Sequence, residues 1–354
     1  MDTSTKKLVK TFVGIIIVMV VILIILFIYM GIASKKVSND RLLSIIEESA
    51  RKYYEKNSSN LPINNKTTEV TTATLISEGY MKSFDKLTSN KNCSGKVIVT
   101  NNGGNYIYSP SLKCDSYSTS YLVDKLKSTV VTSGDGLYQD GDIYYYRGEY
   151  PNNYIKLGDK TYRIMSIDEF GYIKVIDPTT TSNRYEWDDR YSHDMGVNYG
   201  INTFSKSRIN EYYNLKYTDY SELLRSYIVK HDWCIEKRNI EDYDIHAAQC
   251  SEISNNYLGM INTLDYARIS LDTNCTDIRG GSCNNYNYLS NMLDSNIWTA
   301  AVVNNNTYQA YSFESGFDSH NCNSKYKLLF LFHIDGNNLY LSGNGSEDSP
   351  YIIR

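Results

Sequence analysis

The seven cysteines are the residues whose type and spacing most directly suggest chemistry. No Cys-x-x-Cys motif occurs, and no Cys/His spacing fits a zinc site. We therefore interpret them as the disulfide framework of a protein in an oxidising compartment. Spacing alone leaves other connectivities open. The pairs that sequence order suggests are Cys93–Cys114, Cys234–Cys250 and Cys275–Cys283, which leaves Cys322 as a free or intermolecular thiol.

No other residue pattern indicates a catalytic or metal-binding set. The histidines form no HxH, HxxxH or HExxH motif, so we expect them to be dispersed; they are His193, His231, His246, His320 and His333. Two acidic segments, 186–189 (EWDD) and 149–152 (EYPN), contain carboxylate and amide oxygens of the kind that bind Ca²⁺. A solvated acidic turn and a turn that opens a strand are the preferred interpretations. We predict no catalytic, cofactor-binding or metal-binding residue, and no enzyme.

A long apolar segment dominates the start of the chain. Residues 12–33 read FVGIIIVMVVILIILFIYMGIA without a charge. At about 1.5 Å per residue this run spans roughly 33 Å, which is enough to cross a bilayer core. Because all cysteines follow it, the sequence predicts a single-pass membrane protein with its N-terminus inside and its C-terminal part outside. The small net charge of −4 and the lack of a basic tract exclude a nucleic-acid partner.

A helix and a small sheet are expected after the apolar segment. Apolar residues recur at spacings of three and four in residues 35–56, which predicts that the helix continues there. Residues 71–79 predict a short second helix that Thr71 or Thr72 caps. Three strands are predicted at 95–100, 105–109 and 118–122, with a hairpin turn at Asn101-Asn-Gly-Gly104.

This layout, over about residues 8–122, resembles the plan of type IV pilins and pseudopilins. The resemblance implies an amphipathic helix laid on a small antiparallel sheet with a closing cysteine pair, and pilin-like subunits as partners. The chain has Ile16 where that family has a glutamate, and no glycine precedes Phe12. A permanent anchor is therefore predicted in place of a processed filament subunit.

The C-terminal half predicts a β-rich domain. Short alternating runs begin at Ile143, Asn152, Lys160 and Tyr172, and Gly, Asn and Asp turns separate them, as in an antiparallel meander. The segments GEYPNNYIKLGDKTYRIMSID (148–168), INEYYN (209–214), IWTA (297–300) and SGNGSEDSPYII (342–353) are similar to Bacillota surface domains with a C-type-lectin-like or formylglycine-enzyme-like character. The resemblance implies a fold more than an activity.

The sequence thus predicts an α+β protein with a transmembrane helix, a pilin-like helix and sheet, and a C-type-lectin-like domain. The expected divisions are a head (1–11), the membrane helix (12–33), the pilin-like part (34–128), a linker (129–142) and the C-terminal domain (143–354). The expected function is adhesion or binding of a surface carbohydrate, peptide or protein by a protein that contacts the bilayer through Phe12–Ala33. The alternatives are a pseudopilin-like component of a type II secretion or competence system and an extracytoplasmic enzyme on a formylglycine-enzyme-like fold.

Overall fold

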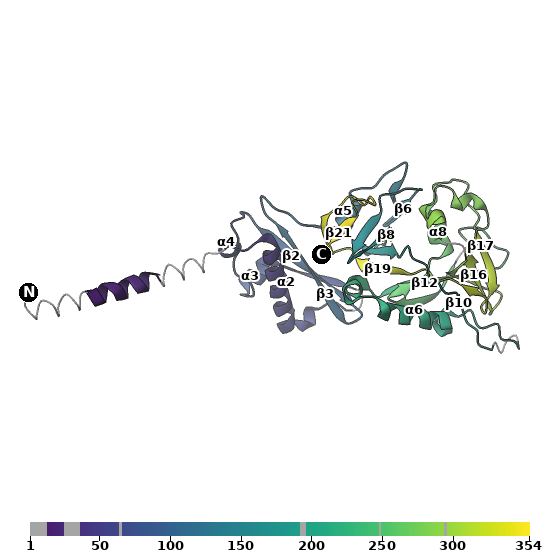
Figure 1. The fold of residues 1–354 in the computed structure, drawn as a ribbon, viewed down its shortest axis with the longest axis horizontal. Coiled ribbons are helices and arrows are strands. Elements are labelled where there is room, and N and C mark those ends of the chain that lie inside the picture. Colours follow the sequence, from purple (N-terminus) through teal and green to yellow (C-terminus); the bar gives the residue numbers. More distant parts are fainter. Residues whose placement is uncertain (1–12, 25–35, 64–65, 192–195, 248, 294–295) are drawn as a thin grey trace, which may run out of the picture. The chain divides into compact units, whose positions relative to one another are not determined.

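The computed structural model describes residues 13–24, 36–63, 66–191, 196–247, 249–293 and 296–354 (Figure 1). The chain is a mixed α/β protein with about 26% helix and 35% strand. It divides into two compact units that interleave in sequence. Unit 1 comprises Met1–Leu61, Thr68–Val99 and Pro110–Ser118, and unit 2 comprises Pro62–Thr67, Thr100–Ser109 and Thr119–Arg354. The domain boundaries expected from the sequence stay predictions.

The predicted transmembrane helix is wrong. Among the described residues, no helix is both long enough and apolar enough to cross a membrane. Residues 13–24 are helical with exposed apolar side chains, while Phe12 and residues 25–33 lie outside the described residues. The predicted continuation into residues 35–56 is also wrong, because residues 36–38 are not helical. Ser38 instead caps a separate helix by accepting a hydrogen bond from the Arg41 backbone N–H.

Unit 1 is built on one amphipathic helix and a three-stranded sheet. Helix α2 (Asn39–Lys56) buries a stripe that includes Leu42, Ile46 and Ala50. This stripe follows from apolar residues at spacings of three and four. The other elements that lie wholly or partly in unit 1 are η1 (Ser58–Asn60), β1 (Thr67–Thr71), α3 (Thr72–Ser77), α4 (Phe84–Leu87), β2 (Ser94–Asn102) and β3 (Asn105–Lys113).

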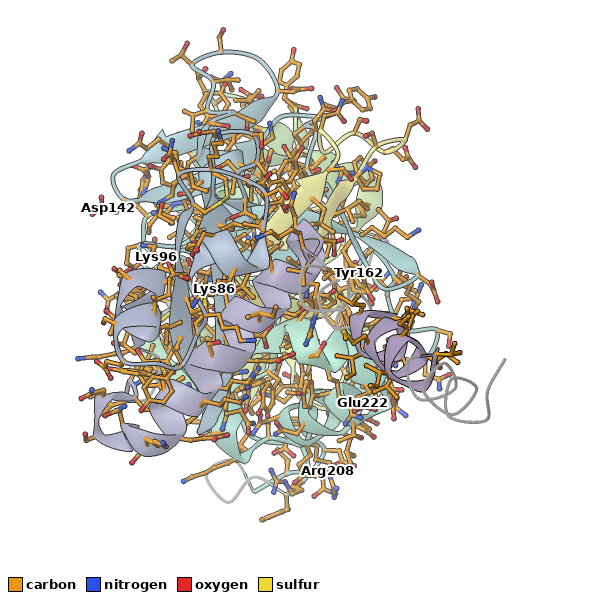
Figure 2. All side chains as sticks on the ribbon, turned by 90° about the vertical axis from the view of Figure 1, so that its left-hand side faces the viewer. Lys86, Lys96, Asp142, Tyr162, Arg208 and Glu222 are labelled. Atoms are coloured by element: carbon orange, nitrogen blue, oxygen red, sulfur yellow. A yellow bond between two sulfur atoms is a disulfide. The ribbon has the colours of Figure 1, made fainter. Side chains whose placement is uncertain are left out.

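The small sheet differs from its prediction in one strand. The β2–β3 hairpin and its turn are confirmed, with Gly103 and Gly104 at positive φ. The sheet order is β1-β2-β3, so its third strand is β1. Residues 118–122 were expected there, but β4 (Ser120–Tyr121) pairs with β20 (Leu339–Ser342) in unit 2. Figure 2 labels Lys96 on β2, whose ammonium lies 2.7 Å from the Glu69 carboxylate on β1.

Unit 2 contains an eleven-stranded sheet and a five-stranded sheet, with short helices between their strands. The helices are α5 (Leu122–Lys127), η2 (Phe204–Lys206), α6 (Arg208–Asp219), α7 (Glu222–Tyr227), α8 (Thr263–Ile269), η3 (Gly281–Asn284) and α9 (Tyr288–Met292). The strands besides β4 and β20 are β5 (Gly136–Asp140), β6 (Ile143–Arg147), β7 (Tyr154–Leu157), β8 (Lys160–Ile167), β9 (Tyr172–Ile176), β10 (Tyr185–Glu186), β11 (Ile228–Val229), β12 (His231–Arg238), β13 (Gln249–Asn256), β14 (Leu258–Gly259), β15 (Ile297–Val303), β16 (Gln309–Phe313), β17 (Phe317–Asn321), β18 (Lys325–Tyr326), β19 (Leu331–Asp335) and β21 (Tyr351–Ile353).

The predicted α+β class with a C-type-lectin-like antiparallel domain is wrong. Strands β7, β8 and β9 do pair antiparallel in sequence, but β21 joins β7 in parallel and β12 joins β15 in parallel. The large sheet has the order β11-β19-β9-β8-β7-β21-β20-β4, and β6 pairs with β8 beside this path. Parallel pairs need crossover connections, which short-range turn signals do not reveal.

Three disulfide bonds are present, between Cys93 and Cys114, Cys234 and Cys250, and Cys275 and Cys283. These are the pairs that sequence order suggests. Cys322 is a free, buried cysteine. Burial raises the pKa of its thiol well above the usual value, and the nearby Asp188 acts in the same direction. A thiol held protonated in this way is a poor nucleophile.

Candidate functional site: a polar pocket in unit 2

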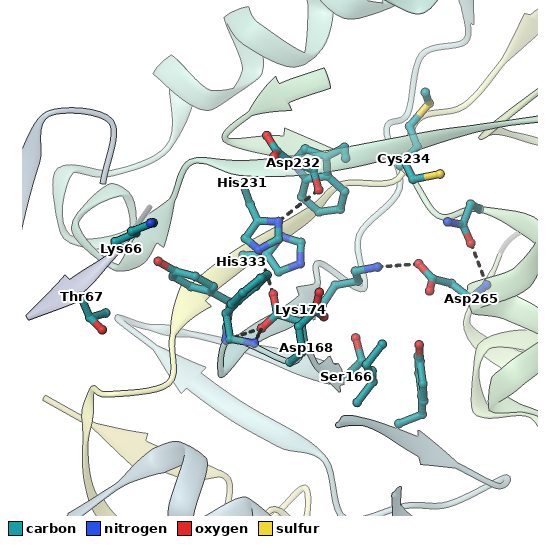
Figure 3. Close-up of a pocket in the computed structure, with 18 residues that line it drawn as sticks. Lys66, Thr67, Ser166, Asp168, Lys174, His231, Asp232, Cys234, Asp265 and His333 are labelled. Carbon is teal, nitrogen blue, oxygen red and sulfur yellow. Dashed lines mark hydrogen bonds and ion pairs between the residues drawn. The ribbon is translucent and has the colours of Figure 1, made fainter. Parts of the chain in front are cut away.

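Unit 2 contains a pocket of about 830 Å³, lined by 18 residues (Figure 3). This volume is within the range of small-molecule binding sites. Charged and aromatic side chains make up most of its wall. The lining residues are Lys66, Thr67, Ile143, Tyr145, Ser166, Asp168, Glu169, Phe170, Tyr172, Lys174, His231, Asp232, Trp233, Cys234, Met260, Asn262, Asp265 and His333.

The floor of the pocket is a row of polar residues across four adjacent strands. Tyr145 on β6 is directly opposite Ser166 on β8, and Ser166 is opposite Lys174 on β9. Lys174 is in turn opposite His333 on β19. Residues that are directly opposite share one face of a sheet, with Cβ atoms about 4.5–5.5 Å apart. The register therefore aligns a phenol, a hydroxyl, an ammonium and an imidazole on one face.

A β-bulge in β8 places the floor residues on this face. Against β9, Ile164 is opposite Val175 but Ser166 is opposite Lys174, so Met165 is the additional residue. In a regular strand Ile164 and Ser166 would share a face, because side chains alternate. The bulge separates them: Ile164 is fully buried among apolar residues, whereas Ser166 lines the pocket. Bulges of this kind re-aim side chains next to functional sites.

His231 is held at both of its ring nitrogens. Its Nε2 lies 2.9 Å from Asp168 Oδ2, and its Nδ1 lies 3.1 Å from the carbonyl oxygen of Asp232. Both partners are acceptors, so with Asp168 ionised the ring makes both hydrogen bonds only when it is doubly protonated. Asp168 is fixed in turn, because its Oδ1 accepts from the backbone N–H groups of Phe170 and Tyr172. The tight turn between β8 and β9 thus also orients the histidine.

His333 is stacked under His231 and is electrically different from it. The ring centroids are 3.9 Å apart with an interplanar angle of 20°. Burial holds the pKa of His333 well below its usual value, and the nearby His231 and Lys174 lower it further. His333 is therefore neutral at pH 7. Its Nδ1 is buried and has no hydrogen-bond partner among the described residues.

Lys174 and Asp265 form an ion pair within the wall. The ammonium lies 2.6 Å from Asp265 Oδ2, and the two side chains are 18% and 11% exposed. Asp265 belongs to the first turn of α8, where Asn262 accepts a hydrogen bond from its backbone N–H. On the same wall, burial raises the pKa of Tyr145 to about 12, and the Asp265 carboxylate adds to the shift.

A glutamate on strand β12 holds the first turn of α8 in place. The buried carboxylate of Glu236 accepts hydrogen bonds from the backbone N–H groups of Thr263 and Leu264. An acidic group at a helix N-terminus satisfies unpaired donors and stabilises the helix dipole. Burial nevertheless raises the pKa of Glu236 above its usual value. The fixed first turn sets the position from which Asp265 meets Lys174.

Of the cysteines and histidines that the structure describes, only Cys234, His231 and His333 line the pocket. Cys234 lines it, and its bond to Cys250 ties β12 to β13. The other cysteines do not line it. The expected dispersal of the histidines is wrong for His231 and His333, which the fold brings into contact.

The remaining histidines and the two acidic segments lie apart from the site. His246 and His320 do not line the pocket, and His193 lies outside the described residues. Neither 149–152 nor 186–189 contributes to it. Among the residues that the structure describes, no group of three His, Cys, Asp or Glu side chains is arranged to hold a metal ion.

The comparisons with known proteins assign no relative. No protein-family model, no curated protein and no solved structure matches the chain. The chemistry of the pocket is therefore the basis on which a function can be argued. A partial signal for the pocket is present in the sequence, since Tyr172-Ile173-Lys174-Val175 alternates polar and apolar residues. That alternation is equally typical of a strand with one solvated face.

Proposed function

We propose that unit 2 binds a small polar ligand in this pocket, as the recognition part of a protein that works outside the cytoplasm. The observation that carries the proposal is a row of polar residues on one face of the eleven-stranded sheet, where it lines the pocket. The row consists of Tyr145, Ser166, Lys174 and His333. Polar groups on a buried sheet face are costly unless they are hydrogen-bonded. A ligand with several hydroxyl or amine groups offers partners at the spacing of the strands.

The pocket side chains Lys174 and His231 are each held in place by a carboxylate, which supports the proposal of a preformed binding site. Lys174 is held by Asp265 and His231 by Asp168, so neither side chain has to be ordered when a ligand arrives. Groups held in place before binding lose little conformational freedom on complex formation, which favours affinity. The three disulfides support a location in an oxidising compartment. Contact with a carbohydrate or peptide of a surface is the role that fits these features.

The proposal can be tested with the purified full chain. Thermal unfolding would be followed in the presence of a panel of monosaccharides, disaccharides, amino acids and polyamines, each at millimolar concentration. A ligand that binds only the folded state raises the midpoint temperature of thermal unfolding. We expect at least one compound to do so and to show saturable heat in calorimetric titration.

Two substitutions on the same strand localise the binding. Ser166→Ala removes the hydroxyl from the floor without adding bulk, and should weaken binding at least tenfold. Thr161→Val, on the same strand but outside the pocket, should leave affinity unchanged. Stabilisation by no compound, or equal binding by both variants, would contradict the proposal. Chemical conversion of the bound compound, seen by NMR, would instead favour an enzyme.

A further inference from the structure

The charged side chains that line the pocket balance one another. Lys174 is paired with Asp265, and the imidazole of His231 with the carboxylate of Asp168. With His231 doubly protonated, as its two acceptors require, each pair is neutral overall. One further lysine and one further glutamate line the pocket, and both are exposed; they are Lys66 and Glu169.

Asp232 borders the pocket but does not change this balance. Side chains alternate along a strand, so Asp232 projects from the face of β12 opposite to His231 and Trp233. It is exposed, and its Oδ1 accepts a hydrogen bond from the amide of the exposed Asn255. The pocket therefore presents no excess charge that a ligand would have to neutralise.

Several buried polar groups of the pocket lack protein partners. Ser166 is 6% exposed, and its hydroxyl makes no hydrogen bond to a residue that the structure describes. His333 is 3% exposed and leaves Nδ1 without a described partner. Asp265 uses Oδ2 on Lys174, while no described residue bonds to its Oδ1. Unpaired groups of this kind cost free energy, which a ligand that bonds to them recovers.

The Lys174–Asp265 pair places unused donors beside an unused acceptor. The ammonium has three N–H groups and gives one of them to Asp265, at 2.6 Å. Lys174 is also directly opposite Ser166 on one neighbouring strand and His333 on the other. Figure 3 shows this ion pair together with the labelled Ser166 and His333. The unsatisfied groups thus form one continuous cluster.

Hydroxyl groups match this cluster better than charged groups do. A hydroxyl both donates and accepts, so of two hydroxyls on neighbouring carbons one can donate to Asp265 Oδ1 while the other accepts from Lys174. The ion pair stays intact in that arrangement. A charged ligand would have to compete with a partner already in place and to lose its own hydration.

We infer that the pocket selects an uncharged sugar, two neighbouring hydroxyl groups of which bind the Lys174–Asp265 pair. The inference rests on the proposed function of the same pocket and narrows its ligand to one chemical class. Ser166 and His333, on either side of Lys174, offer further hydrogen bonds to the same sugar. A zwitterionic amino acid would have to separate the ion pair and is rejected.

The experiment titrates uncharged and charged compounds into the full chain by calorimetry. Methyl α-glucoside, methyl α-mannoside and methyl α-galactoside offer neighbouring hydroxyls in cis and in trans. Glucosamine carries a positive charge, glucuronate a negative charge and serine both. We expect at least one glycoside to bind roughly tenfold more tightly than each charged compound. Serine or a charged sugar binding more tightly than every glycoside would overturn the inference.

Deoxy forms of the tightest glycoside locate its hydroxyls on the unaltered protein. Removing a hydroxyl that bonds to a buried charged group should weaken binding roughly tenfold, because the charged group is left unpaired. We expect this loss for at least two neighbouring positions among the 2-, 3- and 4-deoxy forms. Loss at a single position, at two positions that are not neighbours, or at none would overturn the inference.

Variants of the ion pair supply a readout that a purely structural role would not produce. Asp265→Asn leaves Lys174 without its counter-charge, so glycoside affinity should fall while glucuronate affinity rises. Lys174→Met leaves Asp265 unpaired and should raise glucosamine affinity instead. Glu69→Gln makes the same change in charge as Asp265→Asn in the exposed Lys96–Glu69 pair, and should alter none of these affinities.

The outcomes separate this inference from the proposed function. Variants that lose glycoside affinity without the opposite gains for glucuronate and glucosamine would overturn the role of the ion pair, while binding by the unaltered chain would keep the proposed function. Amino acids or polyamines as the only compounds of the wider panel that bind would have the same meaning. Binding of no compound at all would remove the proposed function itself.

Discussion

Two sheets in this chain use their buried faces in opposite ways. In unit 1, the residues that α2 and the small sheet bury are mostly apolar, as with Ile46 and Val97, both 0% exposed. In unit 2, one face of the β6, β8, β9 and β19 strands carries Ser166, Lys174 and His333 toward a cavity. The first arrangement stabilises the fold by removing apolar surface from water. The second lowers stability, and such sacrifices are expected at functional sites.

The comparison also separates two kinds of ion pair. Lys96–Glu69 in unit 1 is 41% and 52% exposed, whereas Lys174–Asp265 in unit 2 is 18% and 11% exposed, at nearly the same distance. Exposed pairs contribute little because water screens them and two long side chains must be ordered. In a partly buried ion pair the two charges attract each other more strongly, but removing them from water costs free energy. The Lys174–Asp265 pair is therefore better explained as a contact that positions these side chains in the pocket than as a contribution to stability.

The largest effect should come from a cavity in unit 1. Ile46→Ala removes three buried carbons from a fully buried position on α2. We expect a loss of about 2–5 kcal/mol in the free energy of unfolding, from lost transfer energy and the cavity left behind. Urea denaturation of the full chain, followed by far-UV circular dichroism, measures it. Lys52→Ala, on the exposed face of the same helix, is the control and should shift the value by less than about 0.5 kcal/mol.

Much of unit 1 could be predicted from the sequence because its signals are local. The α2 stripe and the Thr71 cap each act within a few residues. The β1 strand was missed because its partner β2 begins more than twenty residues later. The pair Cys93–Cys114 followed from the hairpin between them.

The pocket could not be predicted because its determinants are not local. Tyr162, Ile164 and Ser166 have the same parity in sequence, and only the bulge at Met165 separates Ser166 from the apolar pair. His231 and His333 are about a hundred residues apart and meet through strand order.

A second prediction concerns the stability of unit 2 in acid, which should depend on the protonation of His333. The pKa of His333 is lowered in the folded state, so below its unfolded value of about 6.5 the unfolded chain binds a proton that the native state resists. Stability should therefore fall as the pH drops through this value. From pH 7.5 to pH 5 the loss from this one group can reach at most about 2 kcal/mol, the limit that the unfolded-state pKa of histidine sets.

Replacing the ring isolates that contribution. His333→Phe keeps an aromatic ring beside Trp233 and His231 but cannot bind a proton. Between pH 7.5 and pH 5 its unfolding free energy should fall less than that of the unaltered chain, by up to about 2 kcal/mol. The exposed His246→Phe variant should keep the original dependence. Identical pH profiles for the two variants would show that His333 is not the titrating group.

The smallest effect should come from the exposed pair in unit 1, and it tests whether burial or distance governs the two ion pairs. Lys96→Ala removes an ammonium 2.7 Å from Glu69, on strand positions that water reaches. We expect a loss of less than about 0.5 kcal/mol at low salt. Added salt to 1 M should abolish it, since the screening length falls to about 3 Å. Urea denaturation at both salt concentrations measures the difference. A loss above 1 kcal/mol that persists in salt would mean that short distance outweighs exposure, and would remove the contrast drawn with Lys174–Asp265.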